Sequence, residues 1–324
     1  MFEHRMYLSL AAVAVLLAAG AYTWLGRRGL WLLLALAAAF GVLSARRNED
    51  YRSDLAIWSD TVAKQPDNAR AFNNLGSIRL ARGDLPGAES CFKEAVRLRP
   101  TYPSAHYNLG IVLSRTGRDE EALGHFRTAL SVDDTFVDAR VNAGTVLLKL
   151  GRPADAAGQF EIALRRQPQS SDLHFALGLA LGRLGRRADA IREFETAVRL
   201  DPDSLPAHLS LAEAQIQQGD PAAAERNYRE AVRLQPERAG AHLGLGDLLC
   251  GQNRFPEAIA EYQKTLQAEP ANLHARFFLG NALLVTGRID EAIAQYEEIL
   301  RVRPDEADVL QNLEQARAMK RSAR

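Results

Sequence analysis

A 34-residue repeat occupies most of this chain and constrains its fold more than any other feature. When residues 69–304 are written in rows of 34, position 20 is alanine in every row and position 24 is always aromatic. Position 8 is glycine except for Ala212, and position 15 is glycine except for Asn253. A unit this short cannot bury its own apolar side, so the copies must stack and share a core. The aromatic residues at position 24 are Phe92, Phe126, Phe160, Phe194, Tyr228, Tyr262 and Tyr296.

Each row predicts two short helices that cross closely, so the expected fold class is all-α. Small residues at positions 8 and 20 let the two backbones approach, and the aromatic side chain at position 24 fills the space beside them, contributing about 2–3 kcal/mol by its burial. Glycine or asparagine at position 15 suits a helix that ends in the left-handed conformation. Position 32 is proline in every row except the second, which has Asp134. Proline stops the second helix, and polar residues after it cap the next one.

These rows resemble tetratricopeptide repeats. The resemblance covers residues 69–304 and implies a right-handed superhelical solenoid of seven repeats, whose first helices line a concave groove. Residues 46–68 predict a juxtamembrane helix that covers the first repeat. Residues 305–324 predict a capping helix and tail, with Leu310 and Leu313 facing inward.

The first 45 residues predict a transmembrane hairpin. Residues 6–25 and 29–45 contain no charged side chain, and a helix needs roughly 20 apolar residues, within a range of about 17–25, to span a bilayer. Arg27 and Arg28 separate the two runs, and because one arginine at the bilayer centre costs about 3 kcal/mol, the pair places a turn at the surface. The alternative for the first run is a cleaved signal peptide, although its apolar region would be longer than the usual 7–15 residues or so. We expect a multi-pass protein of the bacterial inner membrane.

Two observations disagree about the side of the membrane on which the repeats lie. Arg5, Arg46 and Arg47 outnumber the two arginines of the turn, which favours a cytoplasmic array. Residues 51–71, in contrast, resemble the segment that joins the last membrane span to the repeats in polytopic proteins related to protein O-mannosyltransferases. That resemblance implies an array outside the cytoplasm, so the side of the membrane stays open.

The resemblance to tetratricopeptide repeats implies that positions 2, 5, 6, 9, 12 and 13 face the groove. Three consecutive repeats have asparagine at position 6, and an amide that donates and accepts can bracket one peptide unit of an extended ligand, at about 1 kcal/mol net for each contact. Basic residues at position 13 and apolar residues at position 5 extend this surface. Asparagine is also frequent at position 6 in the family, and a row of charges is equally typical of a solvated face. The candidate peptide-binding residues are Asn74, Asn108, Asn142, Arg115, Lys149, Arg183, Phe175 and Phe277.

The sequence shows no catalytic or nucleotide-binding motif and predicts no metal site. Histidines recur at position 4 of four repeats, but metal ligands need close spacing within one site, so we interpret each as a replacement for the large aromatic residue usual at that position. The 40 basic and 40 acidic residues give a formal net charge of zero, which is no electrostatic footprint for nucleic acid. These histidines are His106, His174, His208 and His242.

The sequence therefore predicts a non-enzymatic, membrane-anchored scaffold that binds partner proteins or extended peptides in its groove and needs no cofactor. The alternative is an accessory or remnant module of a membrane protein-glycosylation system similar to the O-mannosyltransferases.

Overall fold

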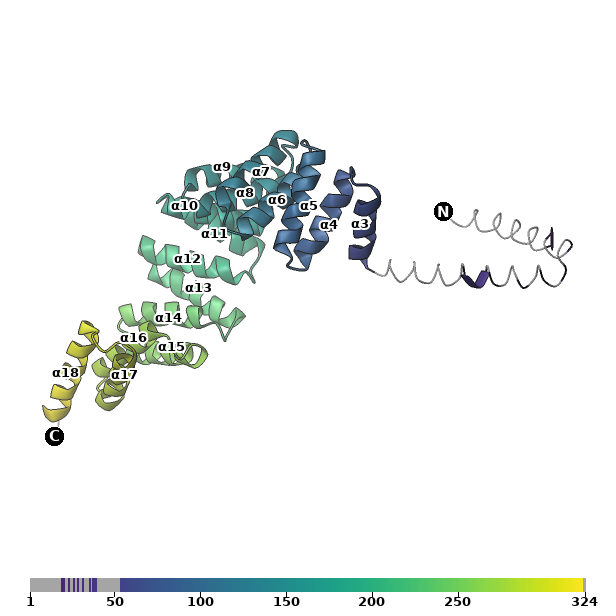
Figure 1. Ribbon diagram of the computed structural model, residues 1–324. Coiled ribbons are helices and arrows are strands. Elements are labelled where there is room, and N and C mark those ends of the chain that lie inside the picture. The colour runs from purple at the N-terminus through teal and green to yellow at the C-terminus, as the bar shows by residue number, and fades with distance from the viewer. Residues whose placement is uncertain are drawn as a thin grey trace. The chain divides into compact units, whose positions relative to one another are not determined.

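The computed structural model describes residues 53–322, together with residues 19, 20, 23, 26, 28, 31, 35 and 37–39. Residues 53–322 form α-helices joined by short turns (Figure 1). The chain divides after Arg118 into two compact units, and each unit is described by itself.

The first unit contains four described helices. They are α3 (Asp54–Lys64), α4 (Ala69–Ala81), α5 (Leu85–Leu98) and α6 (Pro103–Arg115). Each packs against the next, and α4 also packs against α6. The first helices of the first two repeats therefore lie together, as stacking requires.

The second unit continues the same pattern through the remaining repeats. Its helices also pack against their neighbours in sequence, and α8 contacts α10, α10 contacts α12, and α14 contacts α16. The helices are α7 (Asp119–Val132), α8 (Val137–Lys149), α9 (Pro153–Arg166), α10 (Ser171–Arg183), α11 (Arg187–Leu200), α12 (Leu205–Gln218), α13 (Pro221–Leu234), α14 (Ala239–Gly251), α15 (Phe255–Ala268), α16 (Leu273–Val285), α17 (Ile289–Val302) and α18 (Ala307–Ser322).

The core consists of the residues that the repeat pattern places there. The alanines at position 20 are at most 1% exposed, and the aromatic residues at position 24 at most 4%. Position 8 must be glycine in most repeats, because a Cβ atom on Gly144 would lie 2.6 Å from the Phe160 ring and one on Gly280 2.6 Å from the Tyr296 ring. Close approach of helix and ring thus explains these glycines.

The fifth repeat solves the same packing problem differently. Ala212 already has a Cβ atom at position 8 and is fully buried. The Tyr228 ring lies instead against Gly244, at position 6 of the next repeat, where an added Cβ atom would collide with the ring. An alanine in one repeat therefore goes with a glycine in the next.

The first helices end as the sequence predicts. Position 15 is left-handed in all seven repeats, with φ between 70° and 87° at the six glycines and 60° at Asn253. Several first helices begin with the predicted polar cap: Asn68 accepts from the backbone N–H of Ala71, and Asn272 accepts from that of Ala275. Both ends of these helices are thus fixed locally by sequence.

At the C-terminus the orientation predicted for Leu310 is wrong. Leu313 is buried, but Leu310 is 41% exposed and Val309 takes the inward position, with Ala316 also buried. The helix α18 is rotated relative to our expectation, so that Val309, Leu313 and Ala316 form its buried stripe. The chain divisions predicted at residues 45, 68 and 304 stay predictions.

Most of the predicted transmembrane hairpin, residues 6–25 and 29–45, lies outside the described residues. Among the residues that the structure describes, no helix is both long enough and apolar enough to cross a bilayer.

Candidate functional site

The side chain at position 4 ties each first helix to the preceding repeat. In His106, His174, His208 and His242, the ring Nε2 lies 2.8–3.2 Å from the carbonyl oxygen six residues earlier. In two other repeats the side chain is arginine, and Arg140 and Arg276 donate from Nη2 to the equivalent carbonyl at 2.9 and 2.8 Å. We call these six side chains the junction residues.

A second contact holds the junction residues on their other side. His174 Nδ1 lies 2.6 Å from Glu193 Oε2, His208 Nδ1 lies 2.9 Å from Asn227 Oδ1, and His242 Nδ1 lies 2.5 Å from Glu261 Oε2. Each ring thus lies between two oxygen atoms that can accept a hydrogen bond. Arg140 and Arg276 make the matching second contact to Gln159 and Gln295.

The histidines are thus polar junction residues and do more than replace an aromatic residue. Both contacts tie them to their own and the preceding repeat. Within the described part of the chain, no group of three or more His, Cys, Asp or Glu side chains could hold a metal ion.

The three asparagines predicted to form a ladder make different contacts. Asn74, on α4, and Asn108, on α6, belong to the first unit, and Asn142, on α8, belongs to the second. Asn108 Nδ2 donates to Asn73 Oδ1 at 2.9 Å, and Asn142 Nδ2 donates to the backbone oxygen of Asp138 at 2.9 Å. Asn108 Nδ2 also donates to Ser77 Oγ at 3.5 Å, so fewer of these amide groups are available to a ligand than the sequence alone suggests.

The predicted basic residues lie at the C-terminal ends of first helices. Arg115 and Lys149 are exposed at the ends of α6 and α8. Lys149 Nζ lies 3.6 Å from Asp119 Oδ1. Arg183, at the end of α10, donates from Nη1 to the backbone oxygen of Leu148 at 2.5 Å, and the same oxygen, near the end of α8, also accepts from the backbone N–H of Gly151. Arg183 is therefore a stacking contact as well as a candidate groove residue.

The two predicted phenylalanines are half-buried and pack against aromatic residues of the core. The Phe175 ring lies 5.8 Å from the Phe194 ring, centroid to centroid. Phe277 meets Phe278 edge-on at 5.4 Å and lies 6.5 Å from Tyr296. The structure thus places Phe277 in an aromatic cluster that includes a neighbour the sequence did not single out.

Tyrosine replaces phenylalanine at position 24 in the last three repeats, and in two of them the side chain at position 9 is the hydrogen-bond acceptor of its hydroxyl. Tyr262 Oη donates to Asp247 Oδ1 at 2.8 Å, and Tyr296 Oη donates to Asn281 Oδ1 at 2.8 Å. Asp247 and Asn281 both occupy position 9 of their repeats. Burial, together with the Asp247 carboxylate, raises the pKa of Tyr262, so the hydroxyl stays protonated and donates.

Asp247 lines an open pocket of about 370 Å³ that the sequence did not predict. Its other lining residues are Cys250, Gly251, Tyr262 and Phe278. The signal in the sequence was the joint change at positions 9 and 24, because an acceptor appears at position 9 where tyrosine appears at position 24. Phe278 comes from the next repeat and occupies position 6, where the first three repeats have asparagine.

A second pocket of about 230 Å³ shares Phe278 with the first. Apolar side chains of α16, α17 and α18 line it, and charged side chains stand at its rim. The lining residues are Leu273, His274, Phe277, Phe278, Ile299, Arg303, Glu306, Asp308 and Val309.

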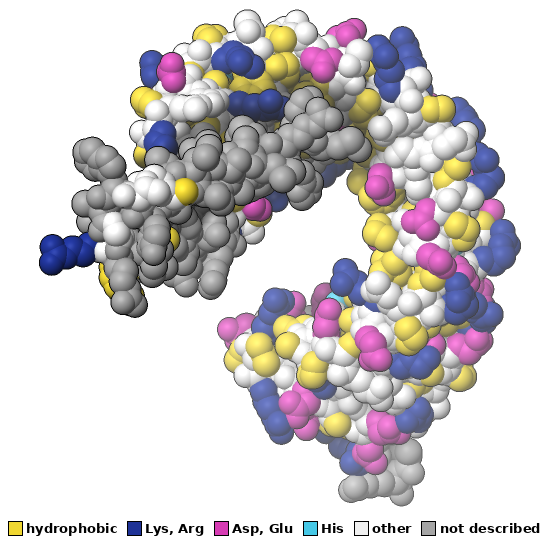
Figure 2. All heavy atoms as spheres, turned by 90° about the vertical axis from the view of Figure 1, so that its right-hand side faces the viewer, with side chains coloured by type: hydrophobic (Ala, Val, Ile, Leu, Met, Phe, Trp, Pro, Cys, Tyr) yellow, Lys and Arg dark blue, Asp and Glu magenta, His cyan; other side chains and the backbone are white. Residues whose placement is uncertain are grey.

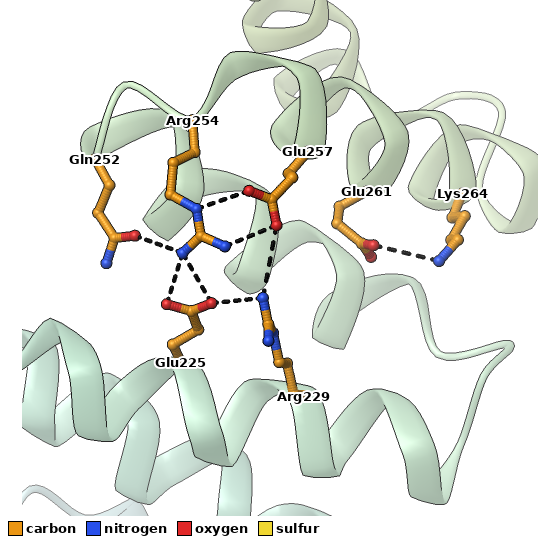
Figure 3. A network of polar contacts seen from close by, with 7 residues as sticks. All are labelled: Glu225, Arg229, Gln252, Arg254, Glu257, Glu261 and Lys264. Carbon is orange, nitrogen blue, oxygen red and sulfur yellow. Dashed lines mark hydrogen bonds and ion pairs between the residues drawn. The ribbon is translucent and has the colours of Figure 1, made fainter.

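Charged side chains also connect repeats away from these pockets. Arg254 lies between Glu225 of the preceding repeat, 2.8 Å from Nη1, and Glu257 of its own repeat, 2.7 Å from Nη2 (Figure 3). Arg118 and Glu89 repeat this arrangement in the first unit, at 2.6 Å and with the same separation of 29 residues. On the face shown in Figure 2, basic and acidic side chains are interspersed over the described helices.

Comparison with protein families gives consistent matches along the repeats. Models described as tetratricopeptide repeat match residues 67–135, 141–204, 175–239, 209–272 and 251–317. A comparison with curated proteins found no match.

Several solved structures share the fold. YrrB, described as a TPR protein with an unusual peptide-binding site, is 21% identical with a TM-score of 0.51, over 57% of this chain and 95% of YrrB. PilF of Pseudomonas aeruginosa is 20% identical with a TM-score of 0.57, over 67% of this chain and 97% of PilF. A MamA fragment from Desulfovibrio magneticus is 25% identical with a TM-score of 0.50, over 52% of this chain and 96% of the fragment.

The buried alanine and aromatic positions, the left-handed residue at position 15 and the family matches from residue 67 to residue 317 agree with one another. The resemblance of residues 51–71 to the O-mannosyltransferase relatives is not shown by these comparisons. The chain belongs to the tetratricopeptide repeat family.

Proposed function

We propose that this protein is a scaffold that binds an extended segment of a partner polypeptide along the first helices of its repeats. The observation that carries the proposal is apolar exposure at positions assigned to the groove. Leu179, Ile216 and Val285 are 36%, 41% and 64% exposed on α10, α12 and α16. All three lie on first helices, at positions that the family resemblance assigns to the groove, where exposed apolar side chains are available to a ligand. The peptide-binding site named for YrrB supports the same use of this fold.

Binding, rather than chemistry, is the proposed activity. The two cysteines are the strongest nucleophiles that the described residues offer, and burial raises the pKa of both Cys91 and Cys250. Their thiols therefore stay protonated at neutral pH, which makes them poor nucleophiles.

Changing the exposed apolar residues tests this function with a matched control. In the full chain, Leu179→Glu, Ile216→Glu and Val285→Glu together are expected to reduce the binding of peptides selected from a displayed random library at least about tenfold. The control is Val132→Glu, Ile162→Glu and Val302→Glu, because these residues are equally exposed but lie on the second helices. Equal losses in both variants, or full binding by the first, would contradict the proposal.

As a more specific part of this proposal, the asparagines at position 6 would form hydrogen bonds to the backbone of the bound peptide. Asn108 and Asn142 already bond groups of the protein itself, so a peptide would have to share these amides with those contacts. Changing all three to alanine is expected to weaken peptide binding by about 1 kcal/mol for each contact used. The melting temperature should fall slightly, because Asn108 also bonds Asn73. Unchanged affinity would remove the asparagines from the site.

We also propose that residues 6–45 tether this scaffold to a membrane, with the bacterial inner membrane as the compartment. The support is the two uncharged runs in the sequence. The test is alkaline carbonate extraction of membranes. The full chain should stay in the pellet, whereas a chain that starts near Asn48 should be released. Release of the full chain would contradict the tether.

A further inference from the structure

The pocket beside Asp247 has a chemistry of its own. The carboxylate of Asp247 is 41% exposed and stands at the wall of the pocket, and the half-buried Phe278 ring forms another part of the lining. The lining contains one acidic and no basic side chain. A carboxylate beside an aromatic face suits a cation, which gains an ion pair from the first and a cation–π contact from the second.

Asp247 is held in place before any ligand arrives. Tyr262 donates to its Oδ1 from the core at 2.8 Å, and His274 Nε2 lies 3.0 Å from its Oδ2. The His274 ring also lies 4.5 Å from the Phe278 ring, so one side chain fixes both partners. A carboxylate has about four acceptor sites, and these contacts leave the exposed ones for a further donor.

The surrounding charge favours the same sign of ligand. Glu213 occupies position 9 of the preceding repeat, and burial, together with the negative charges of Glu213 and Asp247, raises the pKa of Tyr228 to about 12. Two carboxylates therefore face this stretch of the second unit from successive repeats. An acidic ligand segment would be repelled here and a basic one attracted.

The second pocket supplies a neighbouring subsite of different character. Leu273, Phe277 and Val309 contribute apolar lining and share the Phe278 ring with the Asp247 pocket. An extended chain with one side chain in each pocket would therefore have a basic residue close to an apolar one.

We propose that the Asp247–Phe278 pocket binds the lysine or arginine side chain of an extended peptide, whose neighbouring apolar side chain occupies the Phe277 pocket. This inference rests on the proposed function, because it names the partner chemistry of the same surface. Asp247 and Phe278 are the specificity-determining residues, and Tyr262 and His274 position the carboxylate.

The test selects peptides from a displayed random library on the full chain and on two variants. Asp247→Asn keeps an acceptor for Tyr262 but removes the charge. Glu195→Gln is the control, because Glu195 is exposed on a second helix and loses the same charge. Peptides selected on the unaltered protein and on the control should be enriched in lysine or arginine beside an apolar residue, and those selected on Asp247→Asn should lose that enrichment.

Selected peptides are then synthesised with arginine or with its neutral isostere citrulline. Citrulline should weaken binding to the unaltered protein about tenfold and binding to Asp247→Asn less than about twofold. Phe278→Leu should reduce the preference for arginine while leaving the circular dichroism spectrum unchanged.

The outcomes separate the two proposals. If selected peptides bind but show no preference for basic residues, or keep that preference in Asp247→Asn, this inference is wrong and the proposed function stands. If the library yields no binding peptide, both are wrong.

Discussion

The first four repeats and the last three differ at one buried position. Phe92, Phe126, Phe160 and Phe194 fill their repeats with apolar rings, whereas Tyr228, Tyr262 and Tyr296 occupy the same position with a hydroxyl added. Where the ring is tyrosine, position 9 is acidic or amide: Glu213, Asp247 and Asn281. Where the ring is phenylalanine, position 9 is Ser77, Ile111, Thr145 or Leu179.

This difference shows how a structural position can also build a site. A buried hydroxyl needs a partner, and Tyr262 and Tyr296 find theirs in a side chain at position 9, which the family resemblance assigns to the groove. In these tyrosine repeats a buried hydroxyl holds the polar side chain at position 9 by a hydrogen bond, and the phenylalanine repeats have no hydroxyl that could do so. Four predictions test this comparison, from the largest expected effect to the smallest.

Truncating the ring should damage both kinds of repeat equally. Phe160→Ala and Tyr262→Ala are each expected to lower the free energy of unfolding by about 3–5 kcal/mol, because both rings are fully buried. Urea denaturation of the full chain measures the loss, and amide exchange places it in the altered repeat. A loss confined to one kind of repeat would show that packing is not the shared role of position 24.

The second largest effect is expected from raising the pH, because the ionisation of three buried tyrosine hydroxyls would destabilise the folded protein. Burial raises the pKa of Tyr228 and Tyr296 from 10.0 to about 12, and it raises that of Tyr262 as well. The unfolded chain ionises first, so stability that is fully present below about pH 10 is lost as the pH rises toward 12 and above. The urea midpoint and tyrosinate absorbance follow this loss.

The matched control for this pH effect removes the hydroxyls. A variant with phenylalanine at positions 228, 262 and 296 should lose most of the decline above pH 10. An equal decline in that variant would assign the effect to other groups.

Adding a hydroxyl to one of the phenylalanine repeats should make that repeat dependent on an acceptor at position 9, as the tyrosine repeats are. Phe194→Tyr is expected to cost about 1–2 kcal/mol, because position 9 of that repeat is Leu179 and offers no acceptor. Adding Leu179→Asp should recover part of that cost. A double-mutant cycle by urea denaturation measures the coupling between the two changes, and zero coupling would mean that the position 9–24 pair is coincidental.

Charge contacts between repeats should matter least. Arg254→Gln is expected to lower the urea midpoint only slightly, because Arg254 contacts Glu225 across a repeat boundary and Glu257 in its own repeat, and ion pairs at a surface contribute little to stability. Arg288→Gln is the control, since the ion pair of Arg288 in the described contacts is with Glu291 of its own repeat, and its effect on the urea midpoint should be smaller. A larger effect of Arg288→Gln would show that the contact between repeats does not add more stability than the contact within one repeat.

The sequence predicts the fold because the pattern recurs in seven repeats, so the structural requirement at each position can be recognised from seven examples. The glycine facing the Phe160 ring and the left-handed Asn253 follow from rules about backbone approach and helix ends, which are local. The exposed Leu310 did not follow, because a terminal helix has no second copy of its pattern to fix its rotation.

The candidate site was less predictable, because its members vary between repeats. The amides of Asn108 and Asn142 turn toward acceptors in the protein itself, a choice that composition does not reveal. The Asp247–Phe278 pocket combines side chains of two repeats, so no single row of the pattern shows it. The junction histidines were similarly assigned to packing, because their two acceptors lie six residues before and nineteen residues after them.

The junction residues bear on how such an array can change its length over evolution. Each one contacts a main-chain carbonyl oxygen of the preceding repeat, and every amino acid has such an oxygen. A duplicated repeat inserted by recombination could therefore make this contact with any repeat that precedes it. The Arg254–Glu225 contact depends instead on a particular side chain upstream. A new copy should therefore be tolerated more readily at a boundary held by the backbone contact alone than at one that also depends on such a side-chain pair.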